Sequence, residues 1–355
     1  MTSRFNQHIT STTHPMLSIC IATYNRGKYI GETLDSILCQ ILPCVEIVVV
    51  DGASPDNTSE VMAQYLSLYP GIKYFREQEN SGVDRDYDKA VGYSSGEYCW
   101  LMTDDDLARV NSVARILDSL DSNPNLVVVN AEVKSPDFST ILDSNILKYS
   151  NDLNYSEADR NSIFIQLSNY LSFIGSVVIK RQLWLARDRF SYYGTLFIHV
   201  GVIFQNPPIT NVGVIIEPLI VIRYGNAMWT ARSFEIWMFK WPELIWSFSC
   251  FSDDVKLKVC MREPWRSTGR LLYYRALGAF KTGDFRNYLP NDIGIIANLR
   301  FYFTCLVPHS IANFVMTIYI SVFSRESRLK LYDLVHSSHS TLLSRFISRI
   351  SGINY

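Results

Sequence analysis

The chain has 355 residues, a net charge of -1, a hydrophobic content of 48% and a mean hydropathy of +0.04. This length accommodates one large domain, or a domain with an extension. The apolar content and the lack of a recognised nucleic-acid motif argue against a nucleic-acid partner. Seven cysteines without a CxxC pair indicate buried thiols in a reducing compartment, not a disulfide framework or a zinc site.

The chain begins with a repeated pattern of strand, short loop and helix. Leu17–Thr23 is an apolar run typical of a strand, residues 24–27 form a loop, and residues 28–40 predict a helix. Residues 45–50 form a second apolar, β-branched run, as in a strand covered on both faces. The pattern continues through about the first 130 residues, which predicts a doubly wound α/β sheet.

Three consecutive acids follow another apolar run, residues 97–103. Their mutual repulsion is relieved by a bound cation, and hard oxygen ligands suit Mg²⁺ or Mn²⁺. A loop with a helix N-cap is the alternative. In a doubly wound sheet, ligands bind where the strands end, so Thr23 to Asn25, Asp51 and Asp104 to Asp106 are expected to converge.

Four motifs follow one another in order within roughly the first third of the chain: residues 19–40, 48–58, 80–90 and 96–106. In these motifs the chain resembles family 2 glycosyltransferases of the GT-A fold. The resemblance implies that Thr23, Tyr24 and Asn25 line a nucleotide pocket and that Asp51 contacts the base or the ribose. Similar sequences with this acidic triplet resemble dideoxyhexose transferases of O-antigen assembly, such as abequosyltransferases.

The resemblance also implies a metal site, although the motif departs from the common form. Thr103 occupies the usual first aspartate position. The matching register makes Asp105 the direct ligand of Mg²⁺ or Mn²⁺, with Asp104 and Asp106 assisting. The alternative register is Asp104-x-Asp106.

Further site residues have two interpretations each. Asp88 stands where the family has an asparagine near the sugar nucleotide, and a solvated helix acid pairing with Lys89 or Arg85 is the alternative. His199 stands approximately where inverting members have a catalytic acid, and its imidazole is a competent base at neutral pH unless it is packed in the core. The other candidate bases and ligands are Asp188, flanked by Arg187 and Arg189, and Arg223, which suits a leaving diphosphate.

The C-terminal third is basic, aromatic and apolar. From Lys256 onward there are fourteen Lys or Arg against five Asp or Glu. Residues 301–323 form a poor transmembrane span because Pro308, His309, Ser310 and Asn313 interrupt them, and the polar N-terminus predicts no secretory signal. These features predict a helical extension on the inner face of the cytoplasmic membrane, although an ordinary solvated basic face is the alternative.

The expected organisation is a glycosyltransferase domain over residues 1–225, followed by the helical extension, residues 226–355. The domain comprises a nucleotide-sugar half, 1–130, and an acceptor half, 131–225. The expected reaction moves a sugar, such as a deoxy- or dideoxyhexose, from a nucleotide-sugar donor to a saccharide acceptor that is lipid-linked. A nucleotidyltransferase acting on a sugar phosphate and a non-catalytic scaffold with the same fold are the alternatives.

Overall fold

The computed structural model describes residues 14–226, 232–280, 294–323 and 328–350. The chain forms two compact units. Unit 1 comprises Met1–Glu132 and Ser144–Ile222, and unit 2 comprises Val133–Asp143 and Arg223–Tyr355.

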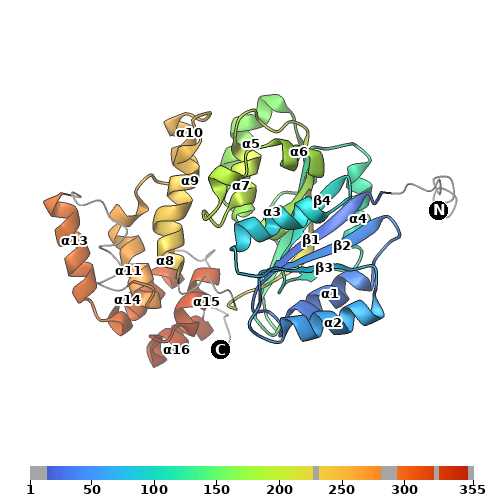
Figure 1. The fold of residues 1–355 in the computed structure, drawn as a ribbon. Coiled ribbons are helices and arrows are strands. Elements are labelled where there is room, and N and C mark those ends of the chain that lie inside the picture. Colours follow the sequence, from blue (N-terminus) through green and yellow to red (C-terminus); the bar gives the residue numbers. More distant parts are fainter. Residues whose placement is uncertain (1–13, 227–231, 281–293, 324–327, 351–355) are drawn as a thin grey trace. The chain divides into compact units, whose positions relative to one another are not determined.

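Unit 1 is built on a mixed β-sheet in the order β3-β2-β1-β4-β9-β6-β10-β5 (Figure 1). Its strands are β1 (Leu17–Thr23), β2 (Val45–Asp51), β3 (Lys73–Arg76), β4 (Tyr98–Met102), β5 (Leu107–Ala108), β6 (Leu126–Lys134), β8 (Leu153–Tyr155), β9 (Val177–Lys180) and β10 (Val212–Arg223). The short β8 pairs with β10, and β7 (Ile141–Asp143), in unit 2, pairs with the last two residues of β6.

The first four strands carry the predicted doubly wound arrangement. β2 and β4 both pair in parallel with β1, and β3 pairs in parallel with β2. The chain therefore winds outward from β1 to β3 and then returns to the other side of β1 with β4. A crevice for ligands lies outside the strand ends at such a reversal. β9 runs antiparallel to both β4 and β6, so the predicted α/β class is confirmed and the sheet as a whole is mixed.

Helices cover both faces of this sheet because successive residues of each buried strand point to opposite sides. Every residue of β1 is buried. Its odd-numbered residues pack in one core with α1 (Ile30–Leu38), α2 (Thr58–Leu68) and α4 (Ser112–Leu120). Helix α3 (Val83–Tyr93) contacts β1 and β2, and Figure 1 shows it on the face opposite α1 and α2. The three short helices α5 (Arg160–Leu167), α6 (Arg181–Ala186) and α7 (Ile198–Phe204) follow.

Unit 2 contains the helices predicted for the C-terminal third. They are α8 (Ser233–Glu235), a π-helical turn (Ile236–Lys240), α9 (Trp241–Ser247), α10 (Asp253–Val259), α11 (Thr268–Leu277), α13 (Ile295–Leu306), α14 (His309–Phe323), α15 (Arg328–His336) and α16 (Leu342–Ile350). Aromatic residues dominate the core around α11, where Phe234 stacks on Phe280 at 4.8 Å and Phe280 meets Phe301 edge to face at 4.6 Å.

Among the described helices, none has by itself the length and apolar composition needed to cross a bilayer. The segment Ala297–Leu306 of α13 and the following helix α14 meet these criteria only as a pair, and the pair bends by 103° at its break.

Candidate active site

The loops after β1 and β2 are tied together at the carboxyl edge of the sheet. The backbone N–H of Asn25 donates to the Ser54 hydroxyl at 2.9 Å, and the Ser54 N–H donates to Asp51 Oδ1 at 2.8 Å. The Gly52 N–H also donates to the Thr23 carbonyl at 2.9 Å. Asn25 has a φ of 58°, a left-handed conformation that asparagine tolerates better than most residues. The fold thus brings Thr23, Asn25 and Asp51 into one small region.

Asp51 is fully buried and hydrogen-bonded through both oxygens. Oδ1 accepts from Ser54, and Oδ2 accepts from the Tyr74 hydroxyl at 2.6 Å. The guanidinium of Arg76 lies 3.8 Å from the same Oδ2. These contacts fix the carboxylate beside the loop that contains the half-buried Tyr24. Because a carboxylate oxygen accepts more than one hydrogen bond, Asp51 retains acceptor capacity for a ligand.

Arg26 reaches from the β1 loop to two of the three acids after β4. Its Nη2 lies 3.5 Å from Asp105 Oδ2, and its Nε lies 3.8 Å from Asp104 Oδ1. The three side chains are between 11% and 14% exposed. A positive group in this position offsets the repulsion between adjacent carboxylates. The sequence motifs do not predict this pairing, because Arg26 and the acids are brought together only by the fold.

The loop that carries Arg26 is held by the start of α2. The backbone N–H groups of Arg26 and Gly27 donate to the Thr58 hydroxyl at 3.1 Å and to Asp56 Oδ2 at 2.9 Å. A Cβ on Gly27 would lie 2.8 Å from the Thr58 nitrogen, so only glycine permits this approach. The base of the Arg26 side chain is therefore well fixed.

The pKa of Asp104 is raised to about 7. Burial is the main cause and the charge of Asp105 adds to it, whereas the charge of Arg26 acts in the opposite direction. A raised carboxyl pKa means that the nearby positive charge does not fully compensate the two acids. The pair consequently favours a proton or a further cation.

Asp106 is placed differently from the other two acids. It is 3% exposed, its carboxylate accepts from the Thr103 hydroxyl, and its backbone carbonyl accepts from the Thr33 hydroxyl at 2.8 Å. These bonds turn the side chain back onto the loop. The structure thus separates the triplet into a pair, Asp104 and Asp105, and a third acid that closes the turn.

The donor set fits a hard divalent cation that is completed by a substrate. In the part of the chain that the structure describes, no group of three or more His, Cys, Asp or Glu side chains is arranged to hold a metal ion. Mg²⁺ is commonly held by only one or two carboxylates together with waters and substrate phosphates. Asp104 and Asp105 have the two carboxylates that such a partial site needs.

Helix α3 contributes a buried acid, Asp86, that sequence reasoning missed. Asp86 is 2% exposed and accepts from the Ser81 hydroxyl at 2.8 Å. A Cβ on Gly52 would lie 2.6 Å from its Oδ2, so the carboxyl packs directly against the residue that follows Asp51. Burial raises the pKa of Asp86 to about 6, although the hydrogen bond from Ser81 lowers it. The only signal in the sequence was a helix start with acids at alternate positions, which is usually a solvated face.

Asp84, two residues before Asp86, organises the segment before α7. Its carboxylate accepts three backbone hydrogen bonds, from Gly194 at 2.8 Å, Leu196 at 2.9 Å and Ile198 at 3.0 Å. Gly194 and Leu196 both have positive φ, and three bonds to one buried carboxylate stabilise this bent path. Asp84 therefore positions the residues that precede His199.

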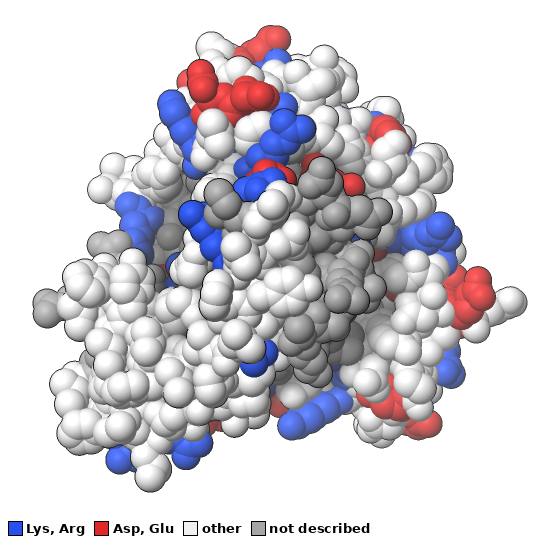
Figure 2. Space-filling model, turned by 90° about the vertical axis from the view of Figure 1, so that its left-hand side faces the viewer, with Lys and Arg blue, Asp and Glu red and all other residues white. Residues whose placement is uncertain are grey.

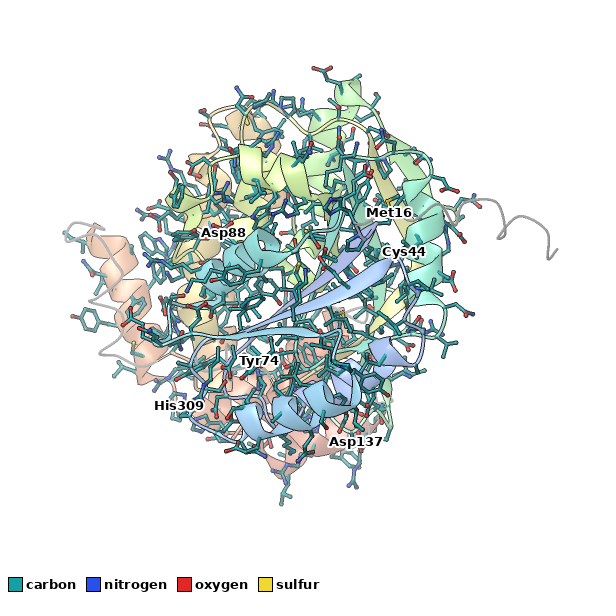
Figure 3. All side chains as sticks on the ribbon, turned by 45° about the vertical axis from the view of Figure 1, so that its right-hand side comes forward. Met16, Cys44, Tyr74, Asp88, Asp137 and His309 are labelled. Atoms are coloured by element: carbon teal, nitrogen blue, oxygen red, sulfur yellow. The ribbon has the colours of Figure 1, made fainter. Side chains whose placement is uncertain are left out.

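Asp88 forms an ion pair with Arg189, at 2.8 Å, and not with Lys89 or Arg85 (Figure 3). Its two oxygens also accept from the Trp184 indole N–H, at 2.8 Å, and from the Tyr193 hydroxyl. The cluster links α3 to the segment between α6 and α7. Its carboxylate is mostly buried, with 12% of the side chain exposed.

His199, the first proposed base, is 1% exposed. Its Nε2 lies 2.7 Å from the carbonyl oxygen of Leu171, so this nitrogen carries the proton and donates. Burial lowers the pKa of His199 to about 4, despite the opposing effect of this hydrogen bond. The imidazole is thus neutral at physiological pH and sits in the core in this conformation.

Asp188, the second proposed base, is exposed. Its Oδ1 accepts from the backbone N–H of Ser191 at 3.2 Å, and hydrogen bonds from Ser191 lower its pKa. The neighbouring Arg187 turns away and donates to the carbonyl oxygens of Val202 and Gln205. Asp188 is therefore accessible, although a lowered pKa makes it a weaker base.

Arg223 is the first residue of the second segment of unit 2. It is 7% exposed, donates to the Pro136 carbonyl at 2.8 Å, and lies over the Phe138 ring at 4.1 Å from its centroid. These contacts hold the residues between β6 and β7 against the end of β10.

Comparison with known proteins agrees with this geometry. A family profile described as "Glycosyl transferase family 2" matches residues 18–171, which contain β1 without its first residue, β2 to β8, and all three acids of the triplet. The abequosyltransferase RfbV of Salmonella typhimurium is 30% identical over 229 residues, which are 59% of this chain and 67% of that protein. The chain belongs to glycosyl transferase family 2. Its activity is therefore glycosyl transfer, as the sequence motifs predicted.

Other relatives match over shorter stretches. The putative teichuronic acid biosynthesis glycosyltransferase TuaG of Bacillus subtilis is 30% identical over 29% of this chain and 41% of its own length. Among solved structures, TarS residues 1–349 of S. aureus superimpose with a TM-score of 0.52 at 16% identity, over 94% of this chain and 88% of that one. The same TarS segment in complex with UDP-GlcNAc gives a TM-score of 0.51 at 15% identity. These structures confirm the predicted GT-A fold.

Proposed function

We propose that this glycosyltransferase moves a sugar from a nucleotide-sugar donor to a hydroxyl group of a saccharide acceptor at the carboxyl edge of β1, β2 and β4. The family implies both substrate classes. The observation that carries the proposal is the Asp104–Asp105 pair, which is linked by Arg26 to the loop holding Asn25 and, through that loop, to Asp51.

In this reaction the bond between the anomeric carbon and the diphosphate oxygen breaks, and a bond from the acceptor oxygen to that carbon forms. The acceptor proton passes to a base, and the nucleoside diphosphate leaves. Asp105 is the proposed direct ligand of Mg²⁺ or Mn²⁺, with Asp104 beside it and Asp106 supporting the turn. Such a cation supplies charge stabilisation for the leaving diphosphate. Arg26 holds the two carboxylates in place.

The nucleotide pocket is proposed to comprise Thr23, Tyr24, Asn25 and Asp51. Asp51 is suited to fix a base or a ribose because its buried carboxylate is already rigidly oriented. Asp88 remains a proposed sugar contact, and its bonds to Trp184 and Arg189 favour a positioning role. Arg223 remains a proposed diphosphate ligand, and its present contacts are with Pro136 and Phe138.

The base that receives the acceptor proton is proposed to be His199 or Asp188. His199 has a free Nδ1 lone pair for a proton, since this atom has no hydrogen-bond partner among the described residues. Its burial opposes the role. Asp188 is accessible, and its lowered pKa opposes the role. Kinetic comparison of variants at the two positions distinguishes them.

The finer identity of the substrates follows from the relatives. Likeness to an abequosyltransferase supports a deoxy- or dideoxyhexose as the transferred sugar, and likeness to TuaG supports cell-surface polysaccharide synthesis. We propose that the acceptor is lipid-linked and that the enzyme acts at the inner face of the cell membrane, where such an acceptor is held. The basic and apolar C-terminal helices support this location.

A panel of nucleotide sugars tests the proposal through their effect on thermal stability. A donor at 100 times its Kd stabilises the folded state by about 2.7 kcal/mol. We expect one nucleotide sugar to raise the Tm in the presence of Mn²⁺, and the shift to disappear in excess EDTA. Asp105→Asn should lose this Mn²⁺-dependent shift. The exposed Asp118→Asn variant, which also loses one carboxylate, is the control and should respond like the wild type. A complete panel without any Mn²⁺-dependent shift would contradict the proposed donor site.

A further inference from the structure

Helix α14 buries two polar residues together with Ala312, Met316 and Ile320, and exposes other apolar residues. Asn313 and Thr317 are fully buried, whereas Ile311, Val315 and Phe323 are 54%, 49% and 73% exposed. A surface helix of a water-soluble domain normally shows the opposite arrangement. Polar residues that face the interior while apolar residues face outward are instead typical of helices in contact with lipid.

The buried polar residues form a complete hydrogen-bond network. The Asn313 side-chain amide donates to the Leu334 carbonyl at 2.8 Å and to the Ser337 hydroxyl at 3.1 Å, and its oxygen accepts from the Ser344 hydroxyl at 2.7 Å. The Thr317 hydroxyl donates to the Asn313 carbonyl at 2.7 Å. Since these groups are satisfied, the inverted arrangement is a stable way to pack α14 against α15 and α16.

Helix α16 repeats the inversion. Ser344 and Ser348 are fully buried, while Leu342, Phe346 and Ile350 are 82%, 62% and 73% exposed. The exposed residues recur at four-residue intervals and therefore share one face of the helix. Helices α14 and α16 contact each other through their buried sides. Together they leave two apolar faces without a partner in the described part of the chain.

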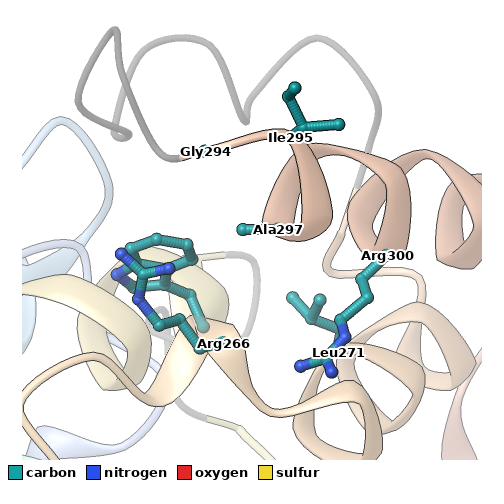
Figure 4. A pocket seen from close by; sticks show the side chains of 7 residues that line it. Arg266, Leu271, Gly294, Ile295, Ala297 and Arg300 are labelled. Atoms are coloured by element: carbon teal, nitrogen blue, oxygen red, sulfur yellow. The ribbon is translucent and has the colours of Figure 1, made fainter.

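Helix α13 adds more exposed apolar residues and a hollow at its N-terminal end (Figure 4). Phe303 and Leu306 are 66% and 76% exposed. The hollow measures about 560 Å³ and is lined by Trp265, Arg266, Leu271, Gly294, Ile295, Ala297 and Arg300. Figure 4 shows the guanidinium groups of Arg266 and Arg300 on opposite sides of it. Arg266 is also bonded to Glu263, with 2.6 Å between Nε and Oε2. A phosphate attached to a hydrocarbon would therefore share Arg266 with that carboxylate and meet Arg300 across the apolar walls.

The charged residues of these helices are predominantly basic. The described parts of α13 to α16 contain the basic residues Arg300, Arg328, Lys330, Arg345 and Arg349. Their single acid, Asp333, accepts hydrogen bonds from Tyr224 and Tyr273 at 2.9 and 3.0 Å. Figure 2, which faces the C-terminal helices, shows a broad area without charged residues, with Lys and Arg along its edges and Asp and Glu mainly at the top and right of the view.

We propose that α13, α14 and α16 enter the boundary between the headgroups and acyl chains of an anionic bilayer, and that the hollow beside α13 holds the phosphate of an anionic phospholipid. This proposal rests on the membrane location proposed above and assigns it to particular side chains. Exposed apolar area and basic residues act together in such interfacial binding. A second copy of the chain is a less suitable partner for these helix faces, because two basic faces repel each other.

Co-sedimentation of the full-length protein with vesicles tests the proposal. Vesicles of phosphatidylcholine are compared with vesicles that also contain phosphatidylglycerol. The variant Leu306→Ser with Phe346→Ser should bind more than about tenfold more weakly to both, because two exposed apolar side chains are lost from the acyl boundary. The matched control, Leu68→Ser with Val110→Ser, removes residues of unit 1 that are 71% and 80% exposed and should bind like the wild type.

A second pair of variants tests the hollow. Arg266→Gln with Arg300→Gln should abolish most of the preference for phosphatidylglycerol and retain binding to phosphatidylcholine. The control Lys148→Gln with Lys258→Gln removes two exposed bases elsewhere and should keep most of that preference. If both double variants lose the preference for phosphatidylglycerol to the same extent, the hollow holds no lipid phosphate.

Three results would overturn the insertion itself. They are unchanged binding of the Leu306→Ser, Phe346→Ser variant, wild-type binding that high salt removes completely, and a change of this variant from dimer to monomer, which would identify a protein interface. Circular dichroism and Tm must match the wild type, and nucleotide-sugar binding is measured without vesicles. A failure of insertion with intact donor binding leaves the proposed transferase function standing.

Discussion

Arg26 and Asp105 form an ion pair, with 3.5 Å between Nη2 and Oδ2, at the edge of the sheet where β1 and β4 end. The same guanidinium lies 3.8 Å from Asp104. The residue after the nucleotide-pocket motif therefore neutralises part of the acidic motif, 79 positions later in the chain. Two predictions concerning charge follow from this edge of the sheet.

Replacing Arg26 by methionine should make the protein more dependent on a divalent cation for its stability. Without Arg26, the carboxylates of Asp104 and Asp105 repel each other with less compensation, and we expect a loss of about 1–2 kcal/mol of unfolding free energy in EDTA. Mn²⁺ should restore more stability to this variant than to the wild type. Lys28→Met is the control, because Lys28 lies in the same loop, stacks on Tyr29 as Arg26 does, and is exposed. Denaturation curves with and without Mn²⁺ give both quantities, and an equal response of the two variants would contradict the ion pair.

Asp86 should make the protein less stable as the pH rises from about 4 to about 6. Its pKa is raised from 3.8 to about 6 in the folded state, so folding favours the protonated form. Protonated Asp86 therefore adds about 3 kcal/mol to the free energy of unfolding when the pH is below the pKa of Asp86 in the unfolded chain. This stabilisation is lost as the pH rises through the pKa of Asp86 in the folded state. Asp86→Asn retains an acceptor for Ser81 and should be more stable than the wild type above pH 6, with the difference vanishing near pH 4. Urea denaturation across this pH range, in EDTA, checks the prediction; a constant difference would show that Asp86 does not titrate as described.

Asp88→Ala should destabilise unit 1 by about 3 kcal/mol. The change leaves the Trp184 indole N–H and the Arg189 guanidinium without their carboxylate in a mostly buried place. Asp88→Asn keeps one acceptor for the Trp184 indole N–H, so it should lose less stability than Asp88→Ala. The Tm and the donor Kd of both variants separate structure from binding. Should the Asn variant keep its Tm and lose donor affinity, Asp88 contacts the sugar nucleotide directly.

His199→Ala distinguishes a base from a core residue. If the imidazole takes the acceptor proton, kcat should fall by about 10²–10⁴ while donor affinity stays nearly unchanged. If it is a packing residue, the Tm should fall and the folded enzyme should keep its turnover. Its 1% exposure and its bond to the Leu171 carbonyl favour the second result. Asp188→Asn, measured on the same acceptor, shows whether the exposed carboxylate takes the proton instead.

Local patterning was sufficient to predict the nucleotide-binding half of the fold. Continuous apolar runs identified β1 and β2, and the helix expected over residues 28–40 corresponds to α1, Ile30–Leu38. The repeat of strand, loop and helix determines which loops share an edge of the sheet. It therefore predicts that Asn25, Asp51 and Asp104 lie near one another.

Long-range pairing was not readable from the sequence. Arg189 pairs with Asp88 from 101 positions away, and Asp84 binds backbone groups of Gly194 to Ile198. No local signal distinguishes such an acid from a solvated one on a helix. The sequence also does not predict which faces of α14 and α16 are buried. Periodicity shows that a helix has two faces, whereas only the packing shows that Asn313 and Ser344 lie on the buried side.

The most direct test of the account measures Mn²⁺-dependent release of the nucleoside diphosphate from a bound nucleotide sugar, in the presence of a saccharide acceptor, by wild type and Asp105→Asn. The amide cannot supply the ligand charge that the carboxylate offers, and Arg26 loses its ion pair with residue 105. We expect the wild type to release the diphosphate and form the glycoside, and the variant to retain its fold while losing transfer and metal-dependent donor binding. Undiminished transfer by Asp105→Asn, or full activity of the wild type in excess EDTA, would contradict the account.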